Sequence, residues 1–181
     1  VLFRSILEGY GLTETVGAAT FNDINREQKT GTVGPPLPGT VVEIRDGEGN
    51  VLGPNEAGEV FVKGPTVMKG YWNRPDATAE AIRDGWFFSG DLAHQDEDGY
   101  FFIVDRAKDM IIRGGENIYP REIEEFLYTH PDILDAQVIG VPDVKYGEEL
   151  MAWVRLRDNA TEFTADDLRE FATGKIARHK I

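Results

Sequence analysis

The sequence contains no cysteine, and this absence excludes a disulfide framework, a thiolate zinc site and a cysteine nucleophile. Histidine is also scarce. The three histidines, at positions 94, 130 and 179, have no metal-ligand spacing and give no basis for a Ser/His/Asp arrangement. No apolar run reaches the length of a transmembrane helix, and the N-terminus lacks the features of a signal peptide. These absences fit the reducing cytoplasm, which is the location we predict.

Positive charge is the other shortage. The 181 residues include 19 Lys and Arg against 32 Asp and Glu, and the formal net charge is −13. No basic run is long enough to bind a polyanion, so we expect no nucleic-acid partner. Apolar residues make up 41% of the chain, enough for one large core or two small ones. The opening VLFRS resembles a translated sequencing-adapter end, and we exclude it from the structural interpretation.

Glycine and proline are frequent from about residue 31 to 105, where they separate short β-branched and aromatic runs. This pattern predicts an antiparallel sheet or a small barrel. One helix is expected over 74–82, with Pro75 near its start. The predicted strands lie in 40–46, 58–64, 85–91 and 99–105.

The composition and the apolar periodicity of the sequence change near residue 108. Apolar periodicity, Pro120 at a helix start and Thr164 as an N-cap predict a β/α unit with its own small core. The fold class is therefore α+β, and we divide the chain into domains at 1–106 and 107–181. Within the second domain we expect helices over 119–131 and 164–176 and strands over 134–141 and 150–157.

The motif EGYGLTET has the residue types of a nucleotide-binding turn. Gly9 and Gly11 would let a ligand approach the backbone closely, and Tyr10 offers a flat face for a base. Thr13 could donate to a phosphate, and Glu14 could hold Mg²⁺, which prefers oxygen ligands. An ordinary glycine-rich turn is the alternative interpretation.

The motif WFFSGDLA places Asp91 after a Ser-Gly turn at the end of an aromatic strand. A carboxylate can accept two hydrogen bonds from a vicinal diol, as in ribose recognition. The alternative is an aspartate that only caps the turn.

The stretch VDRAKDMIIRGGENIYPRE concentrates cations in an otherwise acidic chain. Such a cluster suggests contact with an anion, and its place where the composition changes suits a hinge. The pair Gly114 and Gly115 predicts either a hairpin or close passage of a slender ligand. The alternative is a solvated charged turn followed by a helix with surface charges. The cations are Arg106, Lys108, Arg113 and Arg121.

Five stretches, in this order, resemble the adenylate-forming (AMP-binding) enzymes, a superfamily of acyl-CoA synthetases, aryl-CoA ligases, luciferases and peptide-synthetase adenylation domains. They are YGLTET, GEVFVKGPTVMKGYWNRPDATAEAI, GWFFSGDLA, DRAKDMIIRGGENIYPREIEE and VIGVPDVKYGEEL. The similarity is closest to the fatty acyl-CoA ligase branch. It implies the C-terminal part of the large domain, β-rich and barrel-like, followed by a small mobile α+β domain, with the chain truncated at both ends.

The resemblance also implies roles for the nucleotide-binding motifs. Tyr10, between Gly9 and Gly11, would stack on adenine. Thr13 would contact the α-phosphate, and Glu14 would help to bind Mg²⁺; these two are the catalytic candidates.

Further along the chain, the resemblance implies ribose binding and a hinge. Asp91 and Arg106 would hold the ribose hydroxyls, and Asn117 would face the nucleotide. Lys108 would be the hinge about which the small domain moves between two half-reactions. The family usually has threonine where Ser89 stands, and serine retains the hydroxyl. The pantetheine tunnel would be lined by Gly114, Gly115 and Glu116.

The implied activity is ATP-dependent formation of an acyl-adenylate from a carboxylic acid, followed by acyl transfer to coenzyme A. The cofactors are then ATP, Mg²⁺ and coenzyme A, and the acid is expected to be a fatty acid. An aryl-CoA ligase and an adenylation domain serving a carrier protein are alternatives. A non-catalytic binding module is a third alternative if the chain is complete.

A Thr-Gly-Lys run ending at Lys175 raises the question of the adenylation lysine, which the family carries in such a run. Here the run lies inside an amphipathic helical pattern, so we predict that Lys175 is a helix-surface lysine. The catalytic lysine is expected beyond Ile181. The chain alone is therefore expected not to catalyse adenylation.

Overall fold

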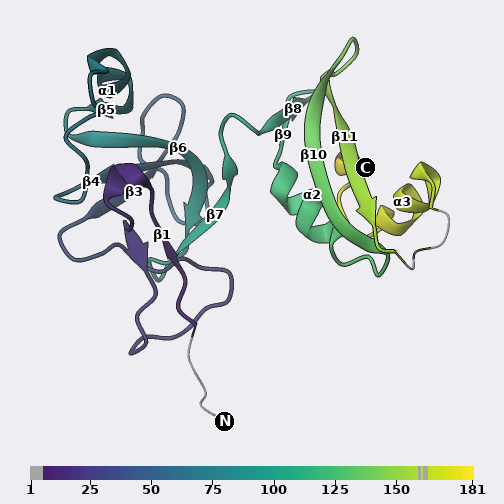
Figure 1. Cartoon of the computed structure of the whole chain (residues 1–181), viewed down its shortest axis with the longest axis horizontal. Coiled ribbons are helices and arrows are strands. Elements are labelled where there is room, and N and C mark those ends of the chain that lie inside the picture. Colours follow the sequence, from purple (N-terminus) through teal and green to yellow (C-terminus); the bar gives the residue numbers. More distant parts are fainter. Residues whose placement is uncertain (1–5, 159, 161–162) are drawn as a thin grey trace. The chain divides into compact units, whose positions relative to one another are not determined.

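The computed structural model describes residues 6–158, 160 and 163–181. The chain divides into two compact units, Val1–Ala107 and Lys108–Ile181, which are coloured purple to teal and teal to yellow in Figure 1. The opening VLFRS lies outside the described residues. No helix among the described residues is long and apolar enough to cross a membrane.

The first unit is built on a five-stranded antiparallel sheet, and all four predicted strands are present in it. Its strands follow the order β3-β4-β6-β5, and β7 pairs with β6. The sheet is open, and none of the sheets in the described residues closes into a barrel, so the sheet alternative is the one observed. The strands are β3 (Val41–Arg45), β4 (Gly58–Lys63), β5 (Ile82–Arg83), β6 (Trp86–Gln95) and β7 (Phe101–Arg106).

Four smaller elements belong to the first unit as well. The pair β1 (Gly9–Tyr10) and β2 (Thr20–Phe21) forms a separate two-stranded sheet, and the short 3-10 helix η1 (Thr13–Thr15) lies between them in sequence. Helix α1 (Pro75–Ala81) begins at a proline, as expected for a residue with no amide hydrogen to satisfy.

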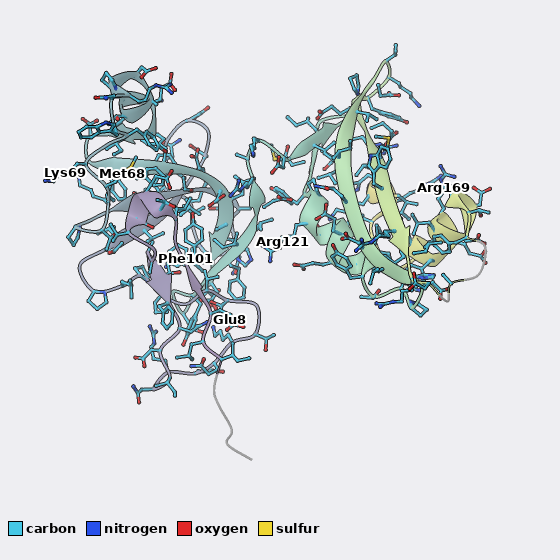
Figure 2. All side chains as sticks on the ribbon, viewed as in Figure 1. Glu8, Met68, Lys69, Phe101, Arg121 and Arg169 are labelled. Atoms are coloured by element: carbon cyan, nitrogen blue, oxygen red, sulfur yellow. The ribbon has the colours of Figure 1, made fainter. Side chains whose placement is uncertain are left out.

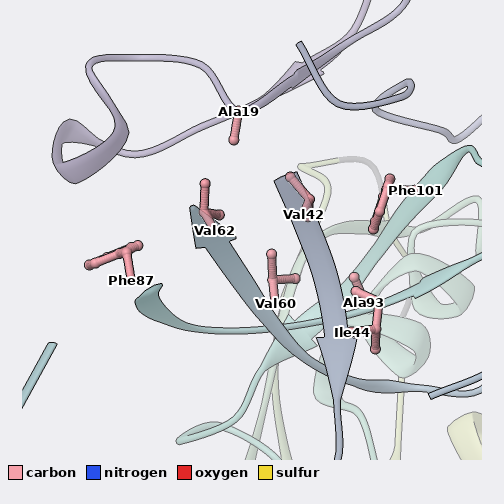
Figure 3. Packing of buried hydrophobic residues seen from close by; sticks show 8 residues of the cluster. All are labelled: Ala19, Val42, Ile44, Val60, Val62, Phe87, Ala93 and Phe101. Atoms are coloured by element: carbon pink, nitrogen blue, oxygen red, sulfur yellow. The ribbon is translucent and has the colours of Figure 1, made fainter. Parts of the chain in front are cut away.

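The core of this unit follows from period-two alternation along the strands. Val42 and Ile44 on β3, and Val60 and Val62 on β4, point to the same buried side. Ala19, which precedes β2, is fully buried against this cluster. The segment that carries the EGYGLTET motif is thereby attached to the large sheet. Figure 3 shows the cluster, which also contains Phe87, Ala93 and Phe101.

The second unit has a four-stranded sheet in the order β10-β11-β8-β9. Both predicted helices are present, and α3 has a capping box in which Thr164 Oγ1 accepts a 3.3 Å hydrogen bond from the Asp167 amide. The elements are β8 (Ile111–Arg113), β9 (Glu116–Ile118), α2 (Pro120–Leu127), β10 (Ile133–Asp143), β11 (Gly147–Leu156), α3 (Ala165–Ala172) and η2 (Arg178–Lys180).

The core of the second unit lies between α2 and the inner face of β10. Ile123 and Leu127 of α2 pack with Ile133 and Val138 of β10, and all four are at most 5% exposed. This packing of an apolar helix face gives the unit the small core of its own that the sequence predicted.

The prediction for Lys175 was wrong. Helix α3 ends at Ala172, and Lys175 lies in a turn rather than on a helix surface. The physical reason is local: Gly174 has φ +77°, a left-handed conformation that stops the helix, and the extended Thr173 forms a bridge to Ile176. Lys175 Nζ lies 3.7 Å from the centre of the Phe171 ring.

Candidate functional site

Three of the predicted site residues meet at the middle of β6, because the strand continues past Asp91 to Gln95 instead of ending there as the sequence had suggested. The Tyr10 hydroxyl donates a 2.7 Å hydrogen bond to Asp91 Oδ2, and Arg106 Nε lies 3.4 Å from Asp91 Oδ1. Asp91 is only 7% exposed, whereas the Arg106 side chain is 58% exposed. The register of β6 and β7 places Asp91 opposite Arg106. The sheet therefore builds this cluster from three motifs that are far apart in the sequence.

Tyr10 is a neutral donor in this cluster. Burial of its ring, together with the hydrogen bond to Asp91, raises the pKa of Tyr10 well above its usual range. The phenol thus keeps its proton over the physiological range and donates it in the hydrogen bond to Asp91.

The predicted Ser-Gly turn does not form: pairing with β4 continues on both sides, so Ser89 and Gly90 make a bulge inside β6 opposite Val60. Ser89 fixes this bulge, which presents Asp91. Its hydroxyl donates a 2.7 Å hydrogen bond to the Val60 carbonyl and accepts a 3.1 Å bond from the Asp91 amide. Gly90, with φ +72°, takes the left-handed conformation at this bulge. Threonine has the same hydroxyl, which accounts for the exchange noted in the sequence. The sequence analysis noted this hydroxyl but did not predict its two hydrogen-bond partners.

The glycines of EGYGLTET allow other parts of the protein to pack closely against this motif. A Cβ on Gly11 would lie 2.3 Å from the Gly17 carbonyl oxygen, and a Cβ on Gly9 would lie 2.4 Å from an atom of the Phe21 ring. Either contact is too short for a real side chain. The motif is therefore a tightly folded turn, whatever it binds.

Within that turn, η1 separates an exposed from a buried hydroxyl. Thr13 is exposed. Thr15 is fully buried; its hydroxyl donates to the Leu12 carbonyl and accepts from the Leu12 amide. The sequence interpretation did not single out Thr15, which is the N3 residue of η1 and accepts from the amide of the N-cap residue Leu12.

Glu14 projects from η1 and is half-buried. Its Oε1 accepts a 2.8 Å hydrogen bond from the Tyr71 hydroxyl, and its backbone carbonyl accepts a 2.8 Å bond from the Met68 amide. Sequence reasoning missed Tyr71, because nothing local in the sequence links it to a residue 57 positions earlier.

The oxygen ligands available at Glu14 and Thr13 fit Mg²⁺. The described residues contain no group of three or more His, Cys, Asp or Glu side chains that could hold a metal by themselves. Mg²⁺ commonly takes one or two carboxylates and completes its shell with water and substrate phosphates. A single carboxylate beside an exposed Thr13 hydroxyl fits a Mg²⁺ ion that arrives with a nucleotide.

In the second unit, Gly114 and Gly115 form the two-residue turn of the β8–β9 hairpin. Their φ angles are +62° and +89°, the left-handed pair that tight hairpins of this kind need. The hairpin alternative is therefore observed. Glu116 and Asn117 follow on β9, and both are exposed.

Three of the four predicted cations, Arg106, Arg113 and Arg121, pair with separate carboxylates. Arg113 Nη2 donates a 2.8 Å hydrogen bond to Glu149 Oε2, and this pairing raises the pKa of Arg113. Arg121 pairs with Glu125 one helical turn later, at 3.0 Å. Arg121 thus has the helix-surface contact of the alternative interpretation.

Lys108 is the first residue of the second unit and is exposed. The residue before it, Ala107, is tied to the first unit by a 2.8 Å hydrogen bond from its amide to the Gly90 carbonyl. The backbone leaves the first unit immediately ahead of Lys108.

Comparisons with known proteins agree with these motifs. The family model described as AMP-binding enzyme matches residues 1–72, and the one described as AMP-binding enzyme C-terminal domain matches residues 122–181. A long-chain-fatty-acid–CoA ligase from Bacillus subtilis is 48% identical over 177 residues, which cover 97% of this chain and 31% of the relative.

Two solved structures are similar throughout. ATP-bound MatB from Rhodopseudomonas palustris has a TM-score of 0.91 and 39% identity, over 98% of this chain and 35% of that one. The o-succinylbenzoate coenzyme A synthetase of Bacillus subtilis, in complex with ATP and magnesium, has a TM-score of 0.86 and 36% identity. The match covers 97% of this chain and 36% of that one. The chain thus spans about a third of the length of these relatives. The two family matches, and relatives similar along almost all of the chain, mean that it belongs to the AMP-binding, or adenylate-forming, enzyme family.

Proposed function

We propose that this chain forms part of an ATP-dependent CoA ligase that activates a carboxylic acid as an acyl-adenylate and transfers the acyl group to coenzyme A. The observation that carries the proposal is the convergence of Tyr10, Asp91 and Arg106. A buried carboxylate with an adjacent aromatic ring and an exposed guanidinium matches the needs of a nucleoside. The names of the relatives supply the reaction class.

In this proposal Asp91 and Arg106 hold the ribose, and Tyr10 stacks on the adenine. Each carboxylate oxygen of Asp91 has two acceptor positions, so a diol can bind in addition to the contacts with Tyr10 and Arg106. Because Tyr10 and Asp91 are joined, base and sugar recognition would be set by one rigid unit.

Thr13 and Glu14 act on the phosphates. The Thr13 hydroxyl donates to the α-phosphate, and the Glu14 carboxylate is the protein ligand of Mg²⁺. When bound, the cation neutralises charge that develops on the phosphates during the transfer. A carboxylate is a poor acyl donor, and adenylation gives it a better leaving group, so stabilisation of that charge is the main catalytic demand.

The second unit contributes to both half-reactions. Lys108 is the hinge residue, and its place directly after Ala107 supports this assignment. Gly114, Gly115 and Glu116 are assigned to the coenzyme A path and Asn117 to the nucleotide.

A fatty acid is the proposed substrate, supported by the name of the Bacillus subtilis long-chain-fatty-acid–CoA ligase. The o-succinylbenzoate coenzyme A synthetase keeps an aryl acid as the second candidate. The cytoplasmic location stays a prediction.

Nucleotide binding is tested most directly with AMP and its deoxy analogues, by titration calorimetry on the 181-residue chain. We expect AMP to bind, and both 2′-deoxy-AMP and 3′-deoxy-AMP to bind at least tenfold more weakly, since each lacks one partner for Asp91. Asp91→Asn should weaken AMP but reduce the difference between AMP and the analogues. Equal affinity for all three nucleotides would contradict the assignment of Asp91 to the ribose.

A further inference from the structure

The segment between β4 and α1 holds Glu14 at two points. The Met68 amide donates to the Glu14 carbonyl, and the Tyr71 hydroxyl donates to Glu14 Oε1, both at 2.8 Å. Met68 and Lys69 mark this segment in Figure 2. One bond fixes the backbone of η1 and the other fixes the end of the side chain, so the whole of Glu14 is held in one position.

Tyr71 is itself fixed by α1. Its amide donates a 2.9 Å hydrogen bond to Thr78 Oγ1, and that hydroxyl donates a 2.8 Å bond to the Arg74 carbonyl. Gly70 makes the approach possible, because a Cβ there would lie 2.7 Å from Thr78 Cγ2. Tyr71 is therefore bonded to α1 through its amide and to Glu14 through its hydroxyl.

We propose that Tyr71 is a positioning residue, whose hydroxyl holds the Glu14 carboxylate in one orientation for a divalent cation bound to ATP. The inference rests on the proposed function, which assigns Glu14 to that cation. A glutamate side chain has three torsions, and ordering them only when the metal binds would cost affinity. Carboxylate ligands are commonly held by a second hydrogen bond for this reason.

The chemistry of the phenol suits this role. The tyrosine hydroxyl is an uncharged hydrogen-bond donor to Glu14 Oε1. A neutral donor orients the carboxylate without cancelling its charge, which a lysine or arginine at the same place would do. The alternative is that the hydrogen bond only holds the segment against η1. A positioning role affects ATP binding only when the metal is present, whereas a purely structural role affects binding with and without it.

The test compares the affinity of the 181-residue chain for Mn²⁺·ATP with its affinity for ATP in the presence of a chelator. Mn²⁺ replaces Mg²⁺ because its paramagnetism reports binding directly. We expect Tyr71→Phe to weaken the binding of Mn²⁺·ATP about 10- to 100-fold and to leave the affinity for metal-free ATP unchanged. Glu14→Gln should have a similar selective effect, and the double variant should be no weaker than Glu14→Gln alone.

Trp72→Phe is the matched control, since Trp72 is the next residue, also aromatic and 90% exposed. It should leave both affinities unchanged. If Glu14→Gln weakens Mn²⁺·ATP and Tyr71→Phe does not, the positioning role is overturned while the proposed function stands. Equal weakening of both ATP forms by Tyr71→Phe would mean that the bond is only a structural fastening. If the unaltered chain binds neither form, the proposed function and this inference both fail.

Discussion

The hydroxyl of Tyr10 donates a 2.7 Å hydrogen bond to Asp91 across 81 residues of sequence. The bond joins β1 of the small sheet to β6 of the large sheet. It is internal to the first unit, and so is the contact of Asp91 with Arg106. Predictions about this cluster can therefore be tested through the stability of that unit as well as through ligand binding.

Ser89→Ala should destabilise the first unit. The change leaves the Val60 carbonyl and the Asp91 amide without their shared partner, and loss of a partner at a partly buried site costs about 1–3 kcal/mol. Urea unfolding followed by circular dichroism measures the change. Ser89→Thr keeps the hydroxyl and should restore most of the free energy of unfolding; a threonine variant as unstable as the alanine variant would contradict this account.

The stability of the first unit should fall as the pH rises above that at which an ordinary tyrosine ionises. Burial raises the pKa of Tyr10 in the folded chain, so the folded state keeps a proton that the unfolded state releases above pH ~10. The contribution is complete below that pH, and the loss is at most about 1.4 kcal/mol per pH unit for one proton. Unfolding measured between pH 8 and 11 should show a shallower decline for Tyr10→Phe. An equal slope in both chains would argue against a buried, protonated Tyr10.

Gly11→Ala should lower the free energy of unfolding by about 1–3 kcal/mol, since the new methyl group would meet the backbone of Gly17 and Ala18. Gly47→Ala is the control, because a Cβ at Gly47 meets nothing within 4 Å. Thermal melting of the two variants gives the comparison. A Gly11 variant as stable as the Gly47 variant would show that the turn can open without cost.

Lys175→Ala should have little effect on either binding or stability. The interaction described for its side chain is with the Phe171 ring, and a cation–π contact at an exposed site contributes about 0.5–1 kcal/mol. AMP affinity, measured as above, should be unchanged. A clear loss of AMP binding would give Lys175 a role at the nucleotide.

The isolated chain should give no steady release of AMP or pyrophosphate from ATP when it is supplied with Mg²⁺, coenzyme A and a fatty acid. The expectation follows from placing the adenylation lysine outside this sequence. A coupled pyrophosphate assay, with a chain-free blank, measures it. Steady turnover would overturn the expectation and would make Lys175 the first lysine to replace.

The strands and helices were largely predictable because their signals are local. Alternation in Val41–Arg45 and Gly58–Lys63, or a proline at the start of α2, acts within a few residues. The end of α3 was misplaced for a local reason too: apolar periodicity continued past Ala172, but Gly174 had the stronger effect on the backbone.

The contacts of the site were less predictable because they join distant segments. The pairing of Tyr10 with Asp91 depends on sheet register, and that of Glu14 with Tyr71 depends on the path around Gly70. The sequence identified Tyr10, Glu14 and Asp91 as candidates, but nothing in their own motifs states which partner each will meet.

The backbone bond from Ala107 to Gly90 has a consequence for how such enzymes could diversify. A genetic crossover just after Ala107 would transfer Tyr10, Asp91 and Arg106 together, with every contact among them intact. An exchanged second unit would bring its own Gly-Gly hairpin and its own helices. If the roles proposed above are correct, hybrids joined at this peptide should inherit nucleotide preference from the parent of the first unit and thiol-acceptor preference from the parent of the second.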